Sequence, residues 1–217
     1  MIRVTLDGAA VGTGREAALP PVSARYSAGT PTLLETEGGN RPTVLSLVAS
    51  GRMKLDAGSV TAVRVDSDGE ARPLTSAQLR RAIALIDTPL VAEHSDDVSI
   101  SSVVKEELAL ARSHRRADRP ASYTDKHSFG SLSAVDRLAL LIDLALRRPD
   151  VEALVITSPE RHGGDPAEWW RLVRVTAARG VAVLVVTDHA TVAHLRALSH
   201  PDPLGSDAVP LFELESH

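Results

Sequence analysis

One polar loop contains residue types that are suited to binding an anion. It includes Gly38, Gly39, Asn40, Arg41 and Thr43, and a predicted helix begins within it. Glycine allows the backbone to approach a ligand closely, and backbone N–H groups at a helix N-terminus attract negative charge. The pattern therefore predicts an anion site, of the kind that holds a phosphate group, where a strand gives way to a helix.

Other kinds of site find little support. The sequence has no cysteine, which removes thiolate metal ligands, cysteine nucleophiles and disulfides. The pairs His189 with His194 and His114 with His127 lack the helical spacing and the nearby carboxylate of a zinc site. Residues 66–69 resemble a turn without the later glutamate of a calcium loop. There is also no Gly-x-Ser-x-Gly motif, so a serine hydrolase is not expected.

Composition narrows the class of partner. The 217 residues carry a net charge of -4 from 24 basic and 28 acidic residues, with 43% hydrophobic and 3% aromatic residues. Few aromatic side chains and no long basic run argue against a nucleic-acid partner, and Arg112 to Arg116 indicates a solvated loop. No segment is apolar over the roughly 20 residues that span a bilayer, and the start of the chain lacks the plan of a secretion signal. We therefore expect a cytoplasmic protein without direct membrane insertion.

The predicted anion loop lies among strands and a helix. Residues 1–11 alternate apolar and polar side chains, which is typical of a half-buried strand. Extended stretches are expected at 22–26 and 31–34, and a strand at 59–65. Between them, residues 42–50 predict a helix with a proline in its first turn and one apolar face. The first third of the chain thus reads as strand, strand, loop, helix, strand.

The rest of the chain favours parallel strands joined by helices. The expected strands lie at 83–86, 151–156 and 181–186, and the expected helices at 101–112, 134–147 and 167–179. Apolar residues nearly encircle the helix at 134–147, which predicts that it packs on more than one side. Continuous apolar strands are typical of the middle of a parallel sheet. Residues 113–130 are polar and predict a flexible or poorly packed connection, and 209–212 predict either a short edge strand or a packing tail. The sequence therefore predicts a single α/β domain over 1–217, with a mostly parallel core sheet and an N-terminal antiparallel β portion.

These elements resemble the nucleotide-binding domain of ABC transporters in their order and in their residue types. The resemblance is strongest from Val22 to Val60, where Ala28-Gly29, the loop, the helix Thr43 to Gly51 and the turn Asp56 to Gly58 follow in the family's order. Thr88-Pro89-Leu90 is similar to the loop that carries the family's glutamine. The resemblance implies a P-loop NTPase fold, with a helical subdomain reduced to about residues 87–135.

The phosphate loop departs from the family's pattern. The resemblance places Arg41 at the lysine that contacts the β- and γ-phosphates, and Pro42 at the hydroxyl that holds Mg²⁺. Asn40 and Glu35 replace loop glycines, and Glu37 adds a second negative charge. Proline offers neither a hydroxyl nor an N–H group. Tight binding of Mg-ATP is therefore not expected.

The strand expected at 151–156 also departs from the family's pattern, in which two carboxylates stand at the end of this strand. In the family an aspartate holds Mg²⁺ and a glutamate activates the attacking water, but here Thr157 and Ser158 stand at these positions. Glu160 follows two residues later. It is either a surface residue of the loop or a substitute base brought in by a shift of that loop.

The motifs that contact a partner subunit are also altered. Leu132 to Asp136 stands for the family's signature but lacks its glycines, so backbone N–H groups cannot approach a phosphate closely. Asp188 stands where the switch histidine is expected, and His189 follows it. Asp165 resembles the family's turn between subunits, although with Pro166 it also fits a helix N-cap.

Three functions remain open from the sequence. The first is a pseudo-ATPase that keeps the fold as a scaffold or accessory subunit, docking on itself, a sister ABC subunit or a membrane protein. The second is an atypical ABC ATPase that works through Arg41 and Glu160 or with a partner's intact site. The third is a nucleotide or phosphate binder without hydrolysis. We expect no metal and no cofactor beyond weakly bound ATP, and residual roles for Glu160, Asp165 and His189 stay possible within this scheme.

Overall fold

The N-terminal part of the chain forms an antiparallel sheet. The computed structural model describes residues 1–36, 38–111, 127–198 and 211–212. Four strands pair in the order β2-β1-β4-β5, with the 3-10 helix η1 (Gly14–Glu16) between the first two. They are β1 (Ile2–Val11), β2 (Leu19–Ser27), β4 (Ala57–Val65) and β5 (Ala71–Pro73). The predicted alternation is confirmed in β1, whose Ile2, Val4 and Leu6 side chains are buried.

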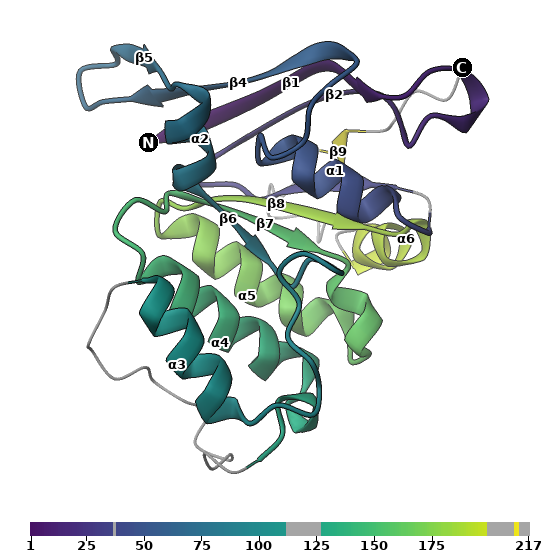
Figure 1. Cartoon of the computed structure of the whole chain (residues 1–217), viewed down its shortest axis with the longest axis vertical. Helices are drawn as coiled ribbons and strands as arrows, with labels where there is room; N and C mark the ends of the chain where they lie inside the picture. Colours follow the sequence, from purple (N-terminus) through teal and green to yellow (C-terminus); the bar gives the residue numbers. More distant parts are fainter. Residues whose placement is uncertain (37, 112–126, 199–210, 213–217) are drawn as a thin grey trace.

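A second sheet, parallel in all its pairings, forms the centre of the molecule (Figure 1). Its order is β6-β7-β8-β3-β9. The strands are β3 (Thr32–Glu35), β6 (Ile83–Ile86), β7 (Ala153–Thr157), β8 (Ala182–Thr187) and β9 (Leu211–Phe212). Every residue of β7 and β8 is buried, as their continuous apolar sequence predicts. The mostly parallel core and the edge strand near the end of the chain are therefore confirmed.

Helix α1 (Arg41–Ala49) lies between the two sheets (Figure 1). Its Leu45 and Val48 side chains are buried in an apolar core that it shares with β1, β2, β7 and β8. The buried hydroxyl of Tyr26 on β2 donates a hydrogen bond of 2.9 Å to the carbonyl oxygen of Ala49 at the end of the helix. The helix is thus fixed from both sides, and its first turn points to the carboxyl edge of the parallel sheet.

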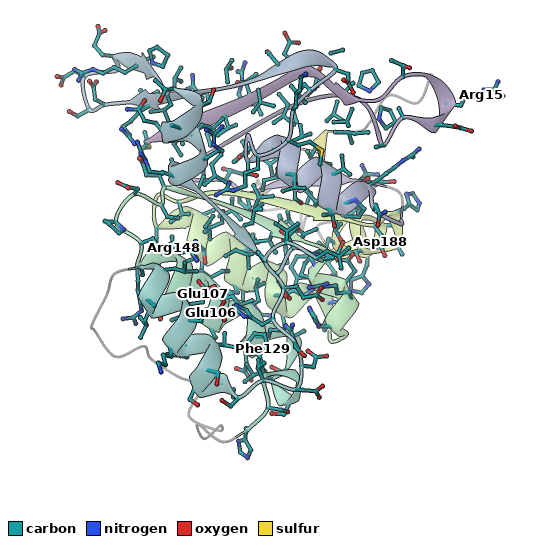
Figure 2. The ribbon with its side chains drawn as sticks, in the orientation of Figure 1. Arg15, Glu106, Glu107, Phe129, Arg148 and Asp188 are labelled. Carbon is teal, nitrogen blue, oxygen red and sulfur yellow. The ribbon has the colours of Figure 1, made fainter. Side chains whose placement is uncertain are left out.

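Three longer helices cover the opposite face of the parallel sheet (Figure 1). They are α3 (Ile100–Leu110), α4 (Ala134–Leu146) and α5 (Pro166–Ala178). Helix α4 is buried over most of its circumference, as predicted, and α5 connects the adjacent parallel strands β7 and β8. An ion pair of 2.6 Å between Glu107 and Arg148 joins α3 to the end of α4 (Figure 2). This layer carries the second apolar core.

Several short elements were not expected from the sequence. They are α2 (Ser76–Ala82), α6 (His189–Leu198), η2 (Phe129–Ser131), η3 (Pro159–His162) and β5. Helix α2 begins with a capping box between Thr75 and Gln78, which is the sequence signal for it. His189, which follows the strand expected at 181–186, is the exposed first residue of α6.

Part of the predicted subdomain lies outside the described residues. The polar connection expected at 113–130 falls largely in 112–126, and Glu37 and most of the C-terminal stretch also lie outside them. The described part of 87–135 contains α3, η2 and the first two residues of α4. Among the described residues, no helix has both the length and the apolar character needed to cross a membrane.

Candidate functional site

The predicted anion loop lies between β3 and α1, at the carboxyl edge of the parallel sheet. Glu35 is the last residue of β3, and Asn40 directly precedes α1 without capping it through its side chain. Arg41 and Pro42 are the first two residues of the helix. Gly39 has a φ of +78°, a conformation that favours glycine. The predicted order of strand, loop and helix is thus confirmed, with a proline in the first turn, where backbone N–H groups would otherwise face an anion.

The remaining loop residues keep the helix start open to one side. Among the described residues other than its chain neighbours, neither Gly38 nor Gly39 has an atom within 4 Å of the place where a side chain would begin. Thr43 lies one residue further into α1. The arrangement retains the dipole of a helix N-terminus, which is favourable for an anion.

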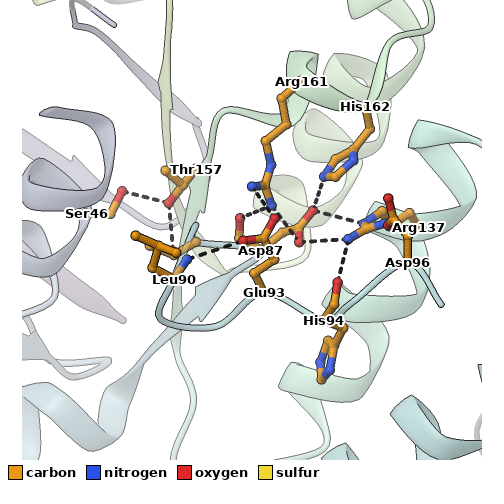
Figure 3. Close-up of polar contacts among 11 residues, drawn as sticks. Ser46, Asp87, Leu90, Glu93, His94, Asp96, Arg137, Thr157, Arg161 and His162 are labelled. Atoms are coloured by element: carbon orange, nitrogen blue, oxygen red, sulfur yellow. Dashed lines mark hydrogen bonds and ion pairs between the residues drawn. The ribbon is translucent and has the colours of Figure 1, made fainter. Parts of the chain in front are cut away.

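A chain of three buried hydroxyls connects α1, the end of β7 and the segment after β6, and Figure 3 shows its Ser46 and Thr157 members. The Thr157 hydroxyl at the end of β7 lies 2.7 Å from the Ser46 hydroxyl on α1 and 2.8 Å from the Thr88 hydroxyl after β6. All three side chains have no exposed surface. Buried polar groups need partners, and here the hydroxyls satisfy one another. At the position that the resemblance assigns to the Mg²⁺ carboxylate, the chain therefore holds an uncharged group that is already engaged in hydrogen bonds.

Glu160 lies beside the end of β8. The Thr187 hydroxyl donates a hydrogen bond of 2.7 Å to its carboxylate. Burial raises the pKa of Glu160 and the charge of Asp188 raises it further, while hydrogen bonds, chiefly the one from Thr187, lower it. The net effect is a carboxyl whose pKa is above its ordinary value, a property common among acid–base groups in active sites.

Negative charge gathers along this edge of the sheet. Asp188 accepts a hydrogen bond of 2.7 Å from the Thr191 N–H group in the first turn of α6. The Nδ1 atom of His189 lies 2.7 Å from a Glu35 carboxylate oxygen, and 79% of the His189 side chain is exposed. Glu35 and Asp188 thus flank the end of β8, near Glu160. Their carboxylates disfavour a polyphosphate in this place.

Asp165 serves as the N-cap of α5. Its carboxylate accepts a hydrogen bond of 2.9 Å from the Ala167 N–H group, and Pro166 follows as the first helical residue. His194 on α6 lies 3.5 Å from the same carboxylate oxygen. The N-cap interpretation is confirmed. Ser133 caps α4 in the same manner, through the Asp136 N–H group.

A partly buried ionic cluster that the sequence did not predict lies next to the hydroxyl chain (Figure 3). We call it the Asp87 cluster. Its members share charge and mutual contacts and come from the loop after β6, from α4 and from η3: Asp87, Glu93, Asp96, Arg137, Arg161 and His162.

Asp87 is the centre of the cluster. Its carboxylate lies 3.1 Å from the Arg137 Nε atom, 2.9 Å from an Arg161 nitrogen and 2.6 Å from the His162 Nε2 atom. Burial raises the pKa of Asp87, but the hydrogen bond from His162 and the charges of Arg161 and Arg137 outweigh it, so the pKa lies below its usual range. Asp87 is therefore a buried carboxylate that stays ionised.

The spacing of these residues along the sequence does not predict the cluster, because its members are up to 75 residues apart. One signal was present, however. Arg137 stands among leucines on a helix predicted to be buried all round, and a charge in such a place needs a partner. Only 3% of Arg137 is exposed, and its guanidinium lies 4.3 Å from the centre of the Phe129 ring.

The described residues hold no group of three or more carboxylate or imidazole side chains arranged to bind a metal ion. The acidic edge thus differs from a metal centre: Glu35 is paired with His189, and Asp188 is engaged at the start of α6.

Comparison with known proteins places the fold. No protein-family model matches the sequence, and no curated protein matches it. Among solved structures, a nucleotide-free ATP-binding cassette from an ABC transporter matches with a TM-score of 0.59 and 17% identity, over 90% of this chain and 85% of that one.

Two further solved structures agree. The ADP conformation of MJ1267, an ATP-binding cassette of an ABC transporter, gives a TM-score of 0.58 at 19% identity, over 87% of this chain and 82% of that one. CbiO1 from Clostridium perfringens, part of the ABC transporter complex cbiONQ, gives 0.52 at 14% identity, over 86% and 78%. The chain has the fold of the ATP-binding cassette of ABC transporters.

Proposed function

We propose that this chain is a cassette-fold protein that does not hydrolyse ATP. The observation that carries the proposal is the buried hydroxyl chain of Ser46, Thr88 and Thr157. Hydrolysis of a nucleoside triphosphate depends on groups that hold Mg²⁺ and stabilise the charge of the transferred phosphoryl group. An uncharged threonine whose hydroxyl is already engaged by two neighbours does not supply them.

The phosphate loop supports the same proposal. Pro42 has no hydroxyl for a metal and no N–H group for a phosphate, and Glu35 brings a carboxylate to the end of β3. Arg41 is a cation that is able to pair with a phosphate oxygen. Weak binding of a phosphate-containing ligand at Gly38, Gly39, Asn40, Arg41 and Thr43 is therefore compatible with the absence of turnover.

A scaffold or accessory role follows if the chemistry is absent. CbiO1, which shares the fold, is described as part of a transporter complex. By analogy we propose a protein partner for this chain, either a second copy, a sister cassette or a membrane protein. Crosslinking of the tagged chain in cells, followed by purification from membranes, should recover one defined partner, whereas a chain that remains uncrosslinked in every fraction argues against this role.

One observation favours a second candidate, an atypical ATPase that uses Glu160. Burial raises the pKa of this carboxyl, as is common for general bases, and it lies at the edge where ligands of parallel sheets bind. In that case the Glu160 carboxylate would orient or deprotonate the attacking water.

A phosphate-release assay with Mg-ATP separates the two candidates. If the first holds, the purified chain and its Glu160→Gln variant release phosphate at the same background rate. Turnover by the natural sequence that is lost in Glu160→Gln would establish the second candidate instead.

The placement of the loop has its own test. Arg41→Lys with Pro42→Ser restores a lysine and a hydroxyl, and should raise the affinity for Mg-ATP by about tenfold or more, as one added hydrogen bond to a charged group would. Arg15→Lys, on the exposed η1, is the matched control and should change nothing. An unchanged affinity in the restored variant would argue that Arg41 and Pro42 do not stand at the phosphate site.

A further inference from the structure

Strained backbone is concentrated at two neighbouring turns. Within the described residues, three non-glycine residues have a positive φ: Asp87 at 52°, Leu90 at 62° and Ser158 at 47°. The first two lie in the loop after β6, and the third directly follows β7, the strand paired with β6. Such conformations persist where surrounding contacts enforce them, and they concentrate at functional segments.

The Asp87 cluster joins these turns through charged side chains. From η3, Arg161 and His162 both reach the Asp87 carboxylate, and Arg161 also lies 2.7 Å from a Glu93 oxygen. The second Glu93 oxygen accepts a hydrogen bond of 3.3 Å from the Leu90 N–H group. One arginine of η3 thus contacts both the start of the loop and the residue that holds its strained tip.

The far end of the loop is fixed from α4. Arg137 lies 2.6 Å from an Asp96 carboxylate oxygen and donates a hydrogen bond of 3.2 Å to the His94 carbonyl oxygen. Gly130 packs so closely on this segment that a side chain there would begin 2.5 Å from the Asp96 Cβ atom. The loop is therefore held at its beginning, middle and end by groups on other elements.

The loop presents apolar side chains to water. Leu90 is 90% exposed and Val91 is 47% exposed. The amides of Val91 and Ala92 both donate to the Thr88 carbonyl oxygen, which closes a turn around Leu90. The Thr88 hydroxyl is bonded in turn to Thr157, the residue before Ser158.

We propose that the Asp87 cluster is a built-in clamp, which fixes residues 87–96 and 157–162 as one rigid unit and keeps Leu90 and Val91 projecting in a single conformation without any bound ligand. Buried ion pairs are better attested as devices of conformational specificity than as sources of stability. The proposal is independent of ATP binding or hydrolysis, since every group of the clamp belongs to the chain itself. The alternative is a set of independent ion pairs, each of which stabilises only the element to which it belongs.

Hydrogen exchange distinguishes the clamp from local pairs. Arg161→Met alters η3, where the side chain is 22% exposed, and should speed exchange at the Val91, Ala92 and Gly130 amides by about tenfold or more, the factor for one lost charge-assisted hydrogen bond. Arg64→Met removes an exposed ion pair with Glu152 and should leave these amides unchanged. Faster exchange confined to residues 158–163 would overturn the clamp.

Asp87→Asn provides a second variant, which removes the charge while keeping a residue that tolerates positive φ. It should speed exchange at the same amides, including Gly130. Unchanged exchange at Gly130 would contradict the clamp.

The strained backbone at Leu90 allows a second test, by thermal unfolding, which does not depend on hydrogen exchange. Leu90→Gly relieves a positive φ and should raise the melting temperature, whereas Val91→Gly, beside it and without positive φ, should lower it or leave it unchanged. In the Asp87→Asn background the gain from Leu90→Gly should shrink, because the released loop is no longer forced into the strained form. An equal gain in both backgrounds would contradict the clamp.

Discussion

At the scale of single residues, Thr157 decides what the carboxyl end of β7 is able to do. Its hydroxyl is bonded to Ser46 on one side and to Thr88 on the other, with no exposed surface. A strand end that serves a metal would need a charged group or a free oxygen in this position. The contacts instead make Thr157 part of the buried packing between α1 and the parallel sheet.

Thr157→Val tests this role. The substitution keeps the shape but leaves the Ser46 and Thr88 hydroxyls buried without their shared partner, so the free energy of unfolding should fall by about 1–3 kcal/mol. Urea unfolding measures it, with Thr61→Val on the exposed face of β4 as the matched control, expected within about 0.5 kcal/mol of the natural chain.

Combining Ser46→Ala, Thr88→Val and Thr157→Val should recover part of the loss, because no unsatisfied hydroxyl then remains. A single variant as stable as the natural chain would contradict the role of the hydroxyl chain.

Glu160 makes the free energy of unfolding depend on pH. Because the folded-state pKa of this carboxyl is raised, the folded chain holds its proton more tightly than the unfolded chain. Below pH 4.5, the ordinary pKa of a glutamate, Glu160 does not change the free energy of unfolding with pH. As the pH rises above 4.5, ionisation of Glu160 lowers the free energy of unfolding. Glu160→Gln should therefore gain stability relative to the natural chain between acidic and neutral pH.

Thermal unfolding at a series of pH values measures this effect. Thr187→Val removes the hydrogen bond that favours the ionised form, and should make the loss of stability with rising pH steeper. A stability difference between Glu160→Gln and the natural chain that shrinks as the pH rises would contradict the assignment.

At the scale of elements, the N-cap of α5 accounts for Asp165. The sequence around this residue also resembles the family's turn between subunits. Asp165→Ala removes the acceptor for the Ala167 N–H group and should cost about 0.5–2 kcal/mol of unfolding free energy. Asp165→Ser, which keeps a capping oxygen, should retain most of the stability. Denaturant unfolding of both variants provides the measurement, and an alanine variant without loss would show that the cap is not what Asp165 contributes.

The elements predicted correctly have strong periodicity or continuous apolar sequence. Strands β7 and β8 and helices α1, α4 and α5 are examples, and their bounds agree with the structure within a few residues. Helices α2 and α6 were missed. Their signals are a capping box at Thr75 and an aspartate at 188, which patterns of hydrophobicity do not register.

The candidate site was predictable in part. Sequence alone placed Arg41 and Pro42 at the start of a helix and Thr157 at the end of a strand, because each of them adjoins a strongly patterned element. The Asp87 cluster depends on α4, η3 and the loop after β6 meeting in space. That meeting is a consequence of packing on the parallel sheet, which no local pattern encodes.

At the scale of the whole molecule, the chain keeps the cassette fold, while the resemblance assigns altered residues to the phosphate site. Two sheets enclose α1, and three helices cover the outer face of the parallel sheet (Figure 1). The two apolar cores explain this persistence, because none of Arg41, Pro42 and Ser158 belongs to them. A change in these residues alters the chemistry of the carboxyl edge at little cost to the packing.

The central claim is that this edge does not engage Mg-ATP as a working cassette does. Isothermal titration of the purified chain with Mg-ATP tests it most directly, with the Arg41→Lys and Pro42→Ser double variant measured alongside. We predict no binding in the micromolar range for the natural sequence and measurable heat for the double variant. Micromolar binding by the natural sequence would contradict the account.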